Sequence, residues 1–213
     1  CIRDSHATFR TGVQMNVDAQ YFAGLFASSD DPWAFRTRWY ERRKRDLIMA
    51  SLPRQFHERI FEPACANGEL SAALAERCAE LLCHDLDPTA VALAQARLAH
   101  LPHIQVDQGR LPGDWPGGRF DLIVLSEIGY YLDPGQWLQV IEQAVASLAA
   151  DGGLLACHWL HPIEGCPQQG RQVHALLEQR LPLYRVLRHE EADFLLEYWS
   201  CQPSVIDLNE TCP

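Results

Sequence analysis

Positive charge is scarce in this sequence, which has 18 lysine and arginine residues against 28 aspartate and glutamate residues. The formal net charge of −10 repels nucleic-acid phosphates and anionic membrane surfaces. Long apolar runs are also missing, because no uninterrupted run reaches the roughly 18 residues that a membrane-spanning helix needs. We therefore expect neither a nucleic-acid partner nor a membrane partner.

Paired cysteines and an export signal are missing too. None of the eight cysteines belongs to a CxxC pair, and most lie in apolar runs, where cysteine behaves as a small hydrophobic residue. The first residues lack the apolar core of a signal peptide. These absences favour a reduced, cytoplasmic protein. With 213 residues and 47% hydrophobic content, the chain suits one well-buried core, as a monomer or a homodimer.

The chain divides into four predicted segments. Residues 1–18 are expected to be a disordered lead or an added remnant, and residues 203–213 a C-terminal tail. Residues 19–52 are expected to form a helical lid, with its helix over Pro32 to Ser51 and six basic residues on that helix. Residues 53–202 form the main domain.

Strand and helix patterns alternate along the main domain. Strands are predicted over 59–64, 80–85, 103–107, 120–126 and 154–159, with helices over 69–78, 88–100 and 136–149 and a turn at Asp151-Gly152-Gly153. A helix over 169–180 and strands over 184–189 and 193–200 follow. The alternation predicts an α/β, doubly wound parallel sheet, in which ligands bind beyond the carboxyl ends of the strands.

The loop after the first predicted strand reads IFEPACANGEL and contains only one glycine, Gly68. Glu62 and the small residues Ala64 and Ala66 would let the backbone approach a ligand there. Asp85 stands 23 positions beyond Glu62, near the spacing at which a carboxylate binds a ribose hydroxyl pair. Alone, such a loop is more often an ordinary turn, and such an aspartate is often a helix cap. Together they favour a nucleotide-type ligand.

A succession of motifs carries a family resemblance. The motifs are Glu62 to Gly68, Asp85-Leu-Asp-Pro88, Phe120 to Glu127 and Asp151 to Gly153. In this order they resemble the class I S-adenosyl-L-methionine-dependent methyltransferases. The stretches DDPWAF, WYERRK, SEIGYYL, HWLHP and HEEADFLLEYW resemble the nodulation protein S branch, over about residues 19 to 200. The resemblance implies a Rossmann-like methyltransferase sheet, mostly parallel with an antiparallel last strand, and S-adenosyl-L-methionine as cofactor.

The same resemblance implies a set of cofactor-binding residues: Glu62, Ala64, Ala66, Gly68, Asp85, Leu86, Gly109, Arg110, Ser126, Tyr40 and Lys44. Ala66 fits the branch, whereas Ala64 departs from it and needs a negative φ to be unstrained. Arg110 stands where many relatives have the acidic residue that binds the adenine amino group. Unless Asp107 replaces that residue, adenine recognition must depend on backbone groups and stacking.

The catalytic candidates are Glu127, Tyr130 and His158, which follow the fourth and fifth strands of the main domain. Glu127 either accepts a proton from an amine acceptor or caps the next helix, and His158 is the competing base. Trp33, Tyr131 and His161 are candidates for contact with the substrate. His158 and His161 form an HxxH pair without an evident third ligand, so we expect no metal.

Two classes of function fit these patterns. The first is a methyltransferase for a small-molecule acceptor, most simply an amino group of a sugar or related metabolite, with O-methylation as its nearest variant. The second is a cofactor-binding or scaffolding protein without turnover, which the departures at Ala64 and Arg110 favour.

Overall fold

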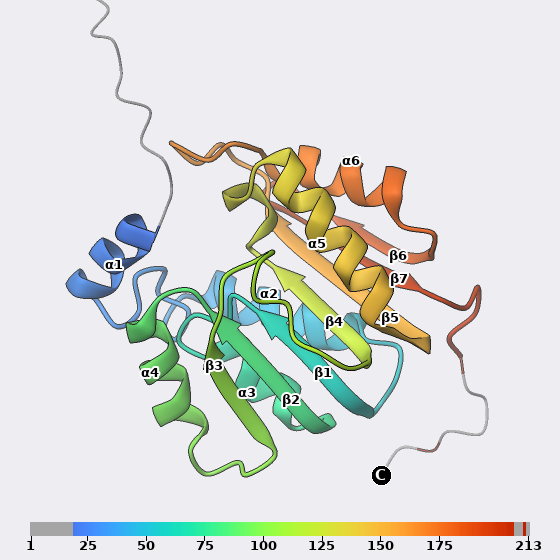
Figure 1. The fold of residues 1–213 in the computed structure, drawn as a ribbon, viewed down its shortest axis with the longest axis horizontal. Helices are drawn as coiled ribbons and strands as arrows, with labels where there is room; N and C mark the ends of the chain where they lie inside the picture. Colours follow the sequence, from blue (N-terminus) through green and yellow to red (C-terminus); the bar gives the residue numbers. More distant parts are fainter. Residues whose placement is uncertain (1–18, 207–210, 212–213) are drawn as a thin grey trace, which may run out of the picture.

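The computed structural model describes residues 19–206 and 211, so the predicted lead lies outside the described residues and the predicted tail lies partly outside them. A seven-stranded sheet forms the middle layer (Figure 1). The strands are β1 (His57–Pro63), β2 (Cys78–Asp85), β3 (Ile104–Gln108), β4 (Phe120–Ser126), β5 (Leu148–Trp159), β6 (Tyr184–Glu190) and β7 (Phe194–Ser200). The helices are α1 (Ala19–Ser28), α2 (Trp39–Ser51), α3 (Glu69–Ala75), α4 (Pro88–Leu98), the short 3-10 helix η1 (Gly129–Tyr131), α5 (Pro134–Ser147) and α6 (Gly170–Arg180).

The order of the strands is β3-β2-β1-β4-β5-β7-β6. β1 pairs in parallel with β2 and β4, while β7 is antiparallel to both of its neighbours. This confirms the predicted methyltransferase sheet with its antiparallel last strand. The order of connection reverses between β1 and β4, and such a switch point opens the ligand crevice of a doubly wound sheet.

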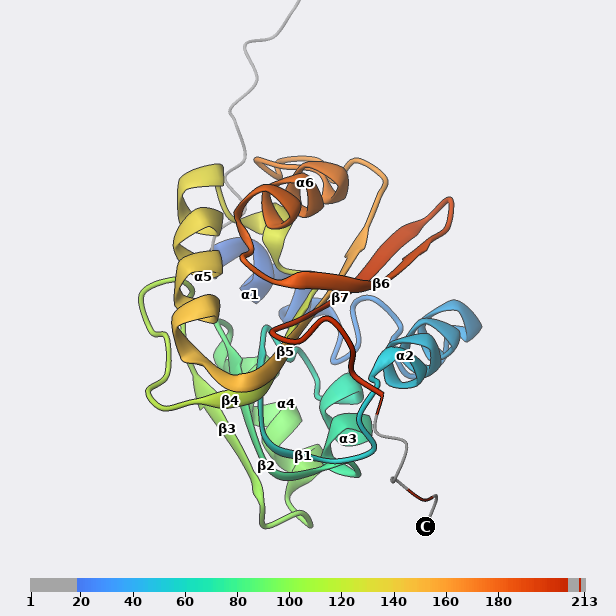
Figure 2. The same ribbon diagram turned by 90° about the vertical axis from the view of Figure 1, so that its right-hand side faces the viewer.

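Helices cover both faces of the sheet, as Figure 2 shows along its edge. α5 and α6 pack on one face around the fully buried Trp137, and α2, α3 and α4 pack on the other around Ile48 and Leu74. β4 has helices on both sides, which explains its unbroken apolar run from Leu122 to Leu125. Among residues 19–206, no helix is both long and apolar enough to cross a bilayer.

Local capping places one aspartate of the Asp85-Leu-Asp-Pro88 motif in the fold and leaves the other at the end of β2. The Asp87 carboxylate accepts hydrogen bonds from the backbone N–H groups of Thr89 and Ala90 at 2.8 and 3.1 Å, so Asp87 is the cap of α4. The alternative reading of Asp85 as a cap is therefore excluded.

Two predicted elements are corrected by the structure. The predicted helix over Pro32 to Ser51 begins only at Trp39, because Ala34 has a φ of +58° and the Asp31 carboxylate accepts from the Phe35 backbone N–H at 2.8 Å, which builds a turn. The turn predicted at Asp151 to Gly153 instead lies inside β5, where the register with β4 shifts.

Candidate active site

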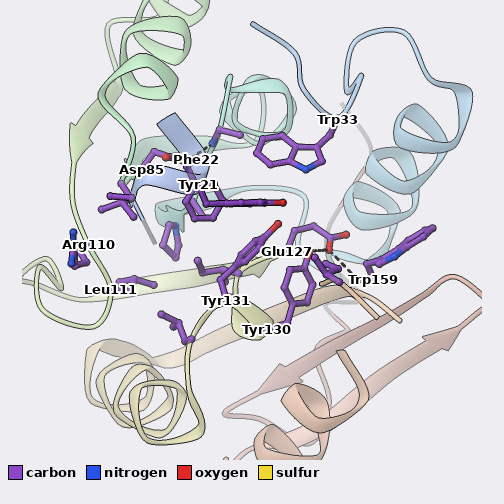
Figure 3. A pocket seen from close by; sticks show the side chains of 18 of the residues that line it. Tyr21, Phe22, Trp33, Asp85, Arg110, Leu111, Glu127, Tyr130, Tyr131 and Trp159 are labelled. Atoms are coloured by element: carbon purple, nitrogen blue, oxygen red, sulfur yellow. Dashed lines mark hydrogen bonds between the residues drawn. The ribbon is translucent and has the colours of Figure 1, made fainter. Parts of the chain in front are cut away.

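A cavity of about 820 Å³ opens at the carboxyl ends of β1, β2 and β4, a size typical of small-molecule sites. η1, the segments that follow β3 and β5, α1, α2 and the segment between α1 and α2 contribute further walls. In Figure 3, Asp85 and Arg110 lie toward one end of the cavity, and Glu127 and Trp159 lie toward the other. The predicted ligand crevice therefore coincides with an actual cavity.

The loop after β1 is strained at both alanines. Ala64 and Ala66 line the cavity with φ values of +59° and +49°. Left-handed backbone costs a non-glycine residue about 1–2 kcal/mol. Ala64 therefore does not have the negative φ that an unstrained alanine needs there. Two hydrogen bonds hold the loop in place: the Ala66 N–H donates to Asp85 Oδ2 at 2.9 Å, and the Cys65 N–H donates to the His84 carbonyl at 3.0 Å.

Replacing Ala64 by glycine should raise the free energy of unfolding by up to about 1.5 kcal/mol. The relief of about 1–2 kcal/mol of backbone strain exceeds the roughly 0.4–1 kcal/mol that a more flexible unfolded chain costs. Ala72 of the α3 helix is the matched control, because Ala72→Gly should lower stability by about 0.5–1 kcal/mol. Urea denaturation measures both variants, and equal losses would contradict the strain.

Asp85 ends β2 with its carboxylate on the cavity wall. Oδ2 accepts from the Ala66 N–H at 2.9 Å and Oδ1 from the Asp87 N–H at 3.0 Å. Burial raises the pKa of Asp85 to about 6 although these hydrogen bonds oppose the shift. Each oxygen keeps a lone pair for a further donor, as binding of two ribose hydroxyls requires.

The other predicted cofactor residues divide into two groups. Leu86, Gly109 and Arg110 line the cavity, while Glu62, Gly68 and Ser126 do not. The Glu62 carboxylate is buried and accepts from the Ser71 hydroxyl at 2.5 Å, and burial raises its pKa to about 7. Glu62 therefore ties α3 to β1. Asp107 is also absent from the lining, so it does not replace the missing acidic residue.

Gly68 packs the loop after β1 against α4. Its φ of +77° suits glycine, and a Cβ there would lie 3.3 Å from the Cα and Cβ of Ala94 in α4. The glycine therefore permits both the turn into α3 and the close packing of α4. Gly68 itself does not line the cavity.

Glu127 is the centre of a hydrogen-bonded cluster at the other end of the cavity (Figure 3). Oε2 accepts from the Tyr130 hydroxyl at 2.5 Å and from the Trp159 backbone N–H at 3.0 Å, and Oε1 accepts from Lys44 Nζ at 2.7 Å. Lys44 also contacts Glu41 Oε2 at 3.0 Å. Glu127 has a φ of +56°, and such strain at a strand end is typical of functional sites.

The charges of this cluster do not balance. Burial lowers the pKa of Lys44, but Glu127, Cys157 and Glu41 raise it by more, so Lys44 stays protonated. Two carboxylates therefore share one ammonium on the cavity wall. Burial together with the Glu127 carboxylate raises the pKa of Tyr130 well above its usual value, which keeps its hydroxyl a donor.

The two predicted histidines lie elsewhere. His158 is fully buried behind the cavity, where its Nε2 accepts from the Gly129 N–H at 3.1 Å. Its predicted contact with an acceptor therefore has no support in the structure. His161 is exposed and pairs with Asp193 at 2.7 Å, outside the cavity lining. Within the described residues, no group of three His, Cys, Asp or Glu side chains is arranged to hold a metal ion.

Aromatic side chains cover the cavity. Tyr21 and Phe22 of α1 reach over it, and the Phe22 ring meets the Tyr131 ring edge to face at 5.0 Å. Trp33 lines it from the segment between α1 and α2. Tyr40 packs edge to face on Trp159, and its buried hydroxyl has no hydrogen-bond partner among the described residues.

The Asn67 side-chain amide joins the segment that carries Trp33 to the loop after β1. The Asn67 Nδ2 group donates to Asp31 Oδ1 at 2.9 Å and to the Asp30 carbonyl at 3.3 Å. Asn67 belongs to the loop after β1, and Asp31 organises the segment that carries Trp33. The segment that carries Trp33 is therefore hydrogen-bonded to the loop beneath it.

Known proteins of one family resemble this chain. The family model described as "Nodulation protein S (NodS)" matches residues 25–165. The chain belongs to the nodulation protein S family. The nodulation protein S of Rhizobium tropici is 28% identical over 133 residues, which are 60% of this chain and 55% of that protein. The chain thus spans little more than half the length of this curated relative.

Solved structures agree with the family. The N-methyltransferase NodS of Bradyrhizobium japonicum WM9, solved with S-adenosyl-L-homocysteine, has a TM-score of 0.77 and 27% identity, covering 85% of this chain and 97% of that one. A candidate methyltransferase from Pseudomonas syringae is 54% identical with a TM-score of 0.69, covering 76% and 99%. The predicted membership of the nodulation protein S family of S-adenosylmethionine-dependent methyltransferases is confirmed.

Within this nodulation protein S family member, α2 is part of the core rather than a removable lid. Its Ile48 is buried, and the backbone carbonyls of Met49 and Leu52 accept from the Arg77 guanidinium at 2.6 and 3.2 Å. In α1, by contrast, Phe26 is the only buried residue. Of the predicted lid over 19–52, only the part before α2 suits a movable cover.

Deleting residues 1–28 should therefore leave the sheet folded and weaken cofactor affinity, because the removed aromatic side chains exclude water from the cavity. Deleting residues 1–51 should abolish cooperative unfolding, since it uncovers the core beneath Ile48. Thermal unfolding and calorimetry with S-adenosylhomocysteine measure the two effects. Full affinity after the shorter deletion would show that α1 is only structural.

Sequence reasoning missed several residues of the cavity wall: Tyr21, Phe22, Phe26, Glu41, Leu111 and Trp159. Strand periodicity could have found Trp159. Leu154, Ala156 and His158 alternate toward the α5 and α6 face of the sheet, whereas Trp159 has the parity of Leu155 and Cys157, and its ring meets that of Tyr40 in α2. The residues of α1 carried no comparable signal.

Proposed function

We propose that the cavity binds S-adenosylmethionine together with the acceptor, with the adenosine end of the cofactor beside Asp85. Asp85 accepts hydrogen bonds from the ribose hydroxyls, and its position at the end of β2 with spare lone pairs supports this role. Leu86 and Leu111 supply apolar contacts for adenine beside the backbone of Gly109 and Arg110. Adenine is then recognised without an acidic side chain.

The methionine end of the cofactor extends toward α2. Of the six basic residues between Pro32 and Ser51, Arg38 and Lys44 line the cavity. Arg36 and Arg43 instead pair with Asp30 and Glu191 at 2.8 and 2.6 Å. Arg38 is the better partner for the methionine carboxylate, because Lys44 is already shared by two carboxylates. The Tyr40 hydroxyl, which has no hydrogen-bond partner in the described part of the chain, lies in the same wall and fits a polar ligand group.

The acceptor is an amino group of a sugar or related small metabolite. One observation carries this assignment: Glu41 and Glu127 face a single ammonium, so the cavity wall keeps an excess negative charge that suits a cationic amine. The rings of Trp33, Tyr131 and Trp159 line the same space and offer flat apolar surfaces to a sugar ring.

The bound cofactor supplies an electrophilic methyl group. The acceptor nitrogen must lose a proton before its lone pair can form the new N–C bond while the S–C bond breaks. Glu127 holds the ammonium and receives that proton. Lys44 and Tyr130 keep the carboxylate oriented, and positioning of the two reactants supplies much of the remaining rate.

Radiolabelled methyl transfer to a deacetylated chitooligosaccharide tests the proposal. We expect label on the amine and none on the fully N-acetylated control, which lacks the nucleophile. Label on the acetylated control would favour O-methylation. Binding of S-adenosylhomocysteine without transfer to either acceptor would favour the cofactor-binding alternative, for which the strained Ala64 is the motivating observation.

A further inference from the structure

A chain of buried polar groups lies behind the cavity, on the α6 side of the sheet. Glu197 of β7, His174 of α6 and His158 of β5 are all at most 2% exposed. Glu197 Oε2 lies 2.6 Å from His174 Nδ1, and His174 Nε2 lies 3.1 Å from His158 Nδ1. The chain ends at the Gly129 N–H, the first residue of η1.

Hydrogen-bond bookkeeping fixes the proton on each ring. The Gly129 N–H is a donor, so His158 Nε2 must be the unprotonated acceptor and Nδ1 must carry the proton. His158 Nδ1–H then donates to His174 Nε2, and His174 Nδ1–H donates to the Glu197 carboxylate. Every member is satisfied with both rings neutral. Burial, together with the positive charge of Lys44, lowers the pKa of His158, which agrees with a neutral ring.

The far end of the chain is anchored by charge. Glu197 Oε1 accepts from Arg188 at 2.7 Å and from Arg185 at 3.0 Å, both on the edge strand β6. A buried carboxylate needs such partners to remain ionised. As an anion it makes the bond to His174 charge-assisted and therefore short and directional.

The near end holds the catalytic segment. Gly129 follows Glu127 by two residues and precedes Tyr130, and its carbonyl accepts from the buried Gln168 Nε2 at 3.3 Å. No side chain fits at this glycine, because a Cβ would lie 2.4 Å from Val173 Cγ1. Since Glu127 is strained, its conformation persists only while its surroundings hold it.

We infer that Glu197, acting through His174 and His158, is a positioning residue that sets the Glu127 to Tyr131 segment against the acceptor. This role rests on the proposed methyl transfer but touches neither cofactor nor acceptor. It also gives His158 a function that needs no proton exchange with the substrate.

Two isosteric variants separate positioning from general-base catalysis at His158. His158→Gln places an amide oxygen near the Nε2 position and keeps the acceptor for Gly129, whereas His158→Asn keeps only a group near Nδ1. A base would be lost in both. We expect a loss on the order of 10²-fold in kcat in His158→Asn, the scale of a misplacement of about 1 Å, and a smaller loss in His158→Gln, which keeps the acceptor for Gly129 but not the bond to His174. Affinity for S-adenosylhomocysteine should stay unchanged in both.

Nuclear magnetic resonance of the full chain supplies a readout that does not depend on activity. At pH 7, nitrogen shifts should report the Nδ1–H tautomer for His158 and His174, and the Gly129 amide should be protected from exchange in the wild type and His158→Gln but not in His158→Asn. An Nε2–H tautomer at His158, or equal protection in both variants, would overturn the inference. If protection follows the variants but no acceptor is methylated, the proposed function fails instead.

Glu197→Gln tests the end of the hydrogen-bonded chain that the two arginines anchor. Its effect must reach Gly129 through His174 and His158. We expect reduced kcat with unchanged cofactor affinity, in the same direction as His158→Asn. A lower melting temperature with wild-type turnover per folded molecule would show that the chain only stabilises the fold, and would overturn the positioning role.

Discussion

Replacing Asp85 by alanine is expected to weaken S-adenosylhomocysteine binding by on the order of 10²-fold or more. The ribose hydroxyls lose two hydrogen bonds to a charged acceptor, each contributing about 1.5–3 kcal/mol. The loop after β1 also loses a support, since Ala66 donates to the same carboxylate. Calorimetry measures the dissociation constant directly. Unchanged affinity would remove Asp85 from the cofactor site.

Asp107 provides the matched control for this substitution. It lies on the adjacent strand β3, directly paired with His84, but outside the cavity lining. Asp107→Ala should therefore bind S-adenosylhomocysteine as tightly as the wild type. A comparable loss in both variants would mean that the substitutions damage the sheet rather than a specific contact.

Acidification should weaken cofactor binding through the same residue. Burial raises the pKa of Asp85 to about 6, so the accepting carboxylate predominates above that pH and is lost as pH falls through it. Affinity for S-adenosylhomocysteine should thus decline between about pH 7.5 and 5. In Asp85→Asn the decline should vanish, and a decline of equal size in that variant would assign it to another group.

Glu127→Gln should lower the turnover of an amine acceptor by on the order of 10²–10⁴-fold, the range typical of general acid–base catalysis. The amide keeps the shape of the side chain but has no basic oxygen to receive the proton. Affinity for S-adenosylhomocysteine should change little, since Asp85 is at the other end of the cavity. Single-turnover measurement of methyl transfer gives the chemical rate separately from product release.

Glu41→Gln is the control for charge at this end of the cavity. Glu41 contacts the same ammonium as Glu127, whereas the Tyr130 hydroxyl and the Trp159 backbone N–H donate to Glu127. A modest rise in KM with preserved kcat is expected there. If Glu127→Gln turns over normally, the amine arrives neutral and the carboxylate only positions it.

The strands could be predicted because burial on both faces leaves a plain signal in the sequence. A continuous apolar run such as 120–126 is typical of a strand that is covered on both faces, and β4 spans the same residues. The N-terminal helices were harder, since the turn at Ala34 depends on a strained φ and on the Asp31 side chain, neither of which periodicity reveals.

Strand-end reasoning located the site but not the orientation of each side chain. It placed Asp85 and Glu127 on the cavity wall, yet it treated His158 alike although the residue has the parity of buried Ala156. The bond between Lys44 and Glu127 joins residues 83 positions apart, and no local pattern encodes such a contact. The tertiary fold alone brings these charges together.

The hydrogen bond from Asn67 to Asp31 has a thermodynamic consequence, because it joins the loop after β1 to the cover formed by α1 and the segment that carries Trp33. If closing the cover tightens cofactor binding by some factor, linkage requires that the bound cofactor favour closure by the same factor. Cofactor binding and access of the acceptor to the cavity then depend on the same opening and closing equilibrium of the cover. The acceptor therefore meets a cavity whose shape depends on whether the cofactor is already bound.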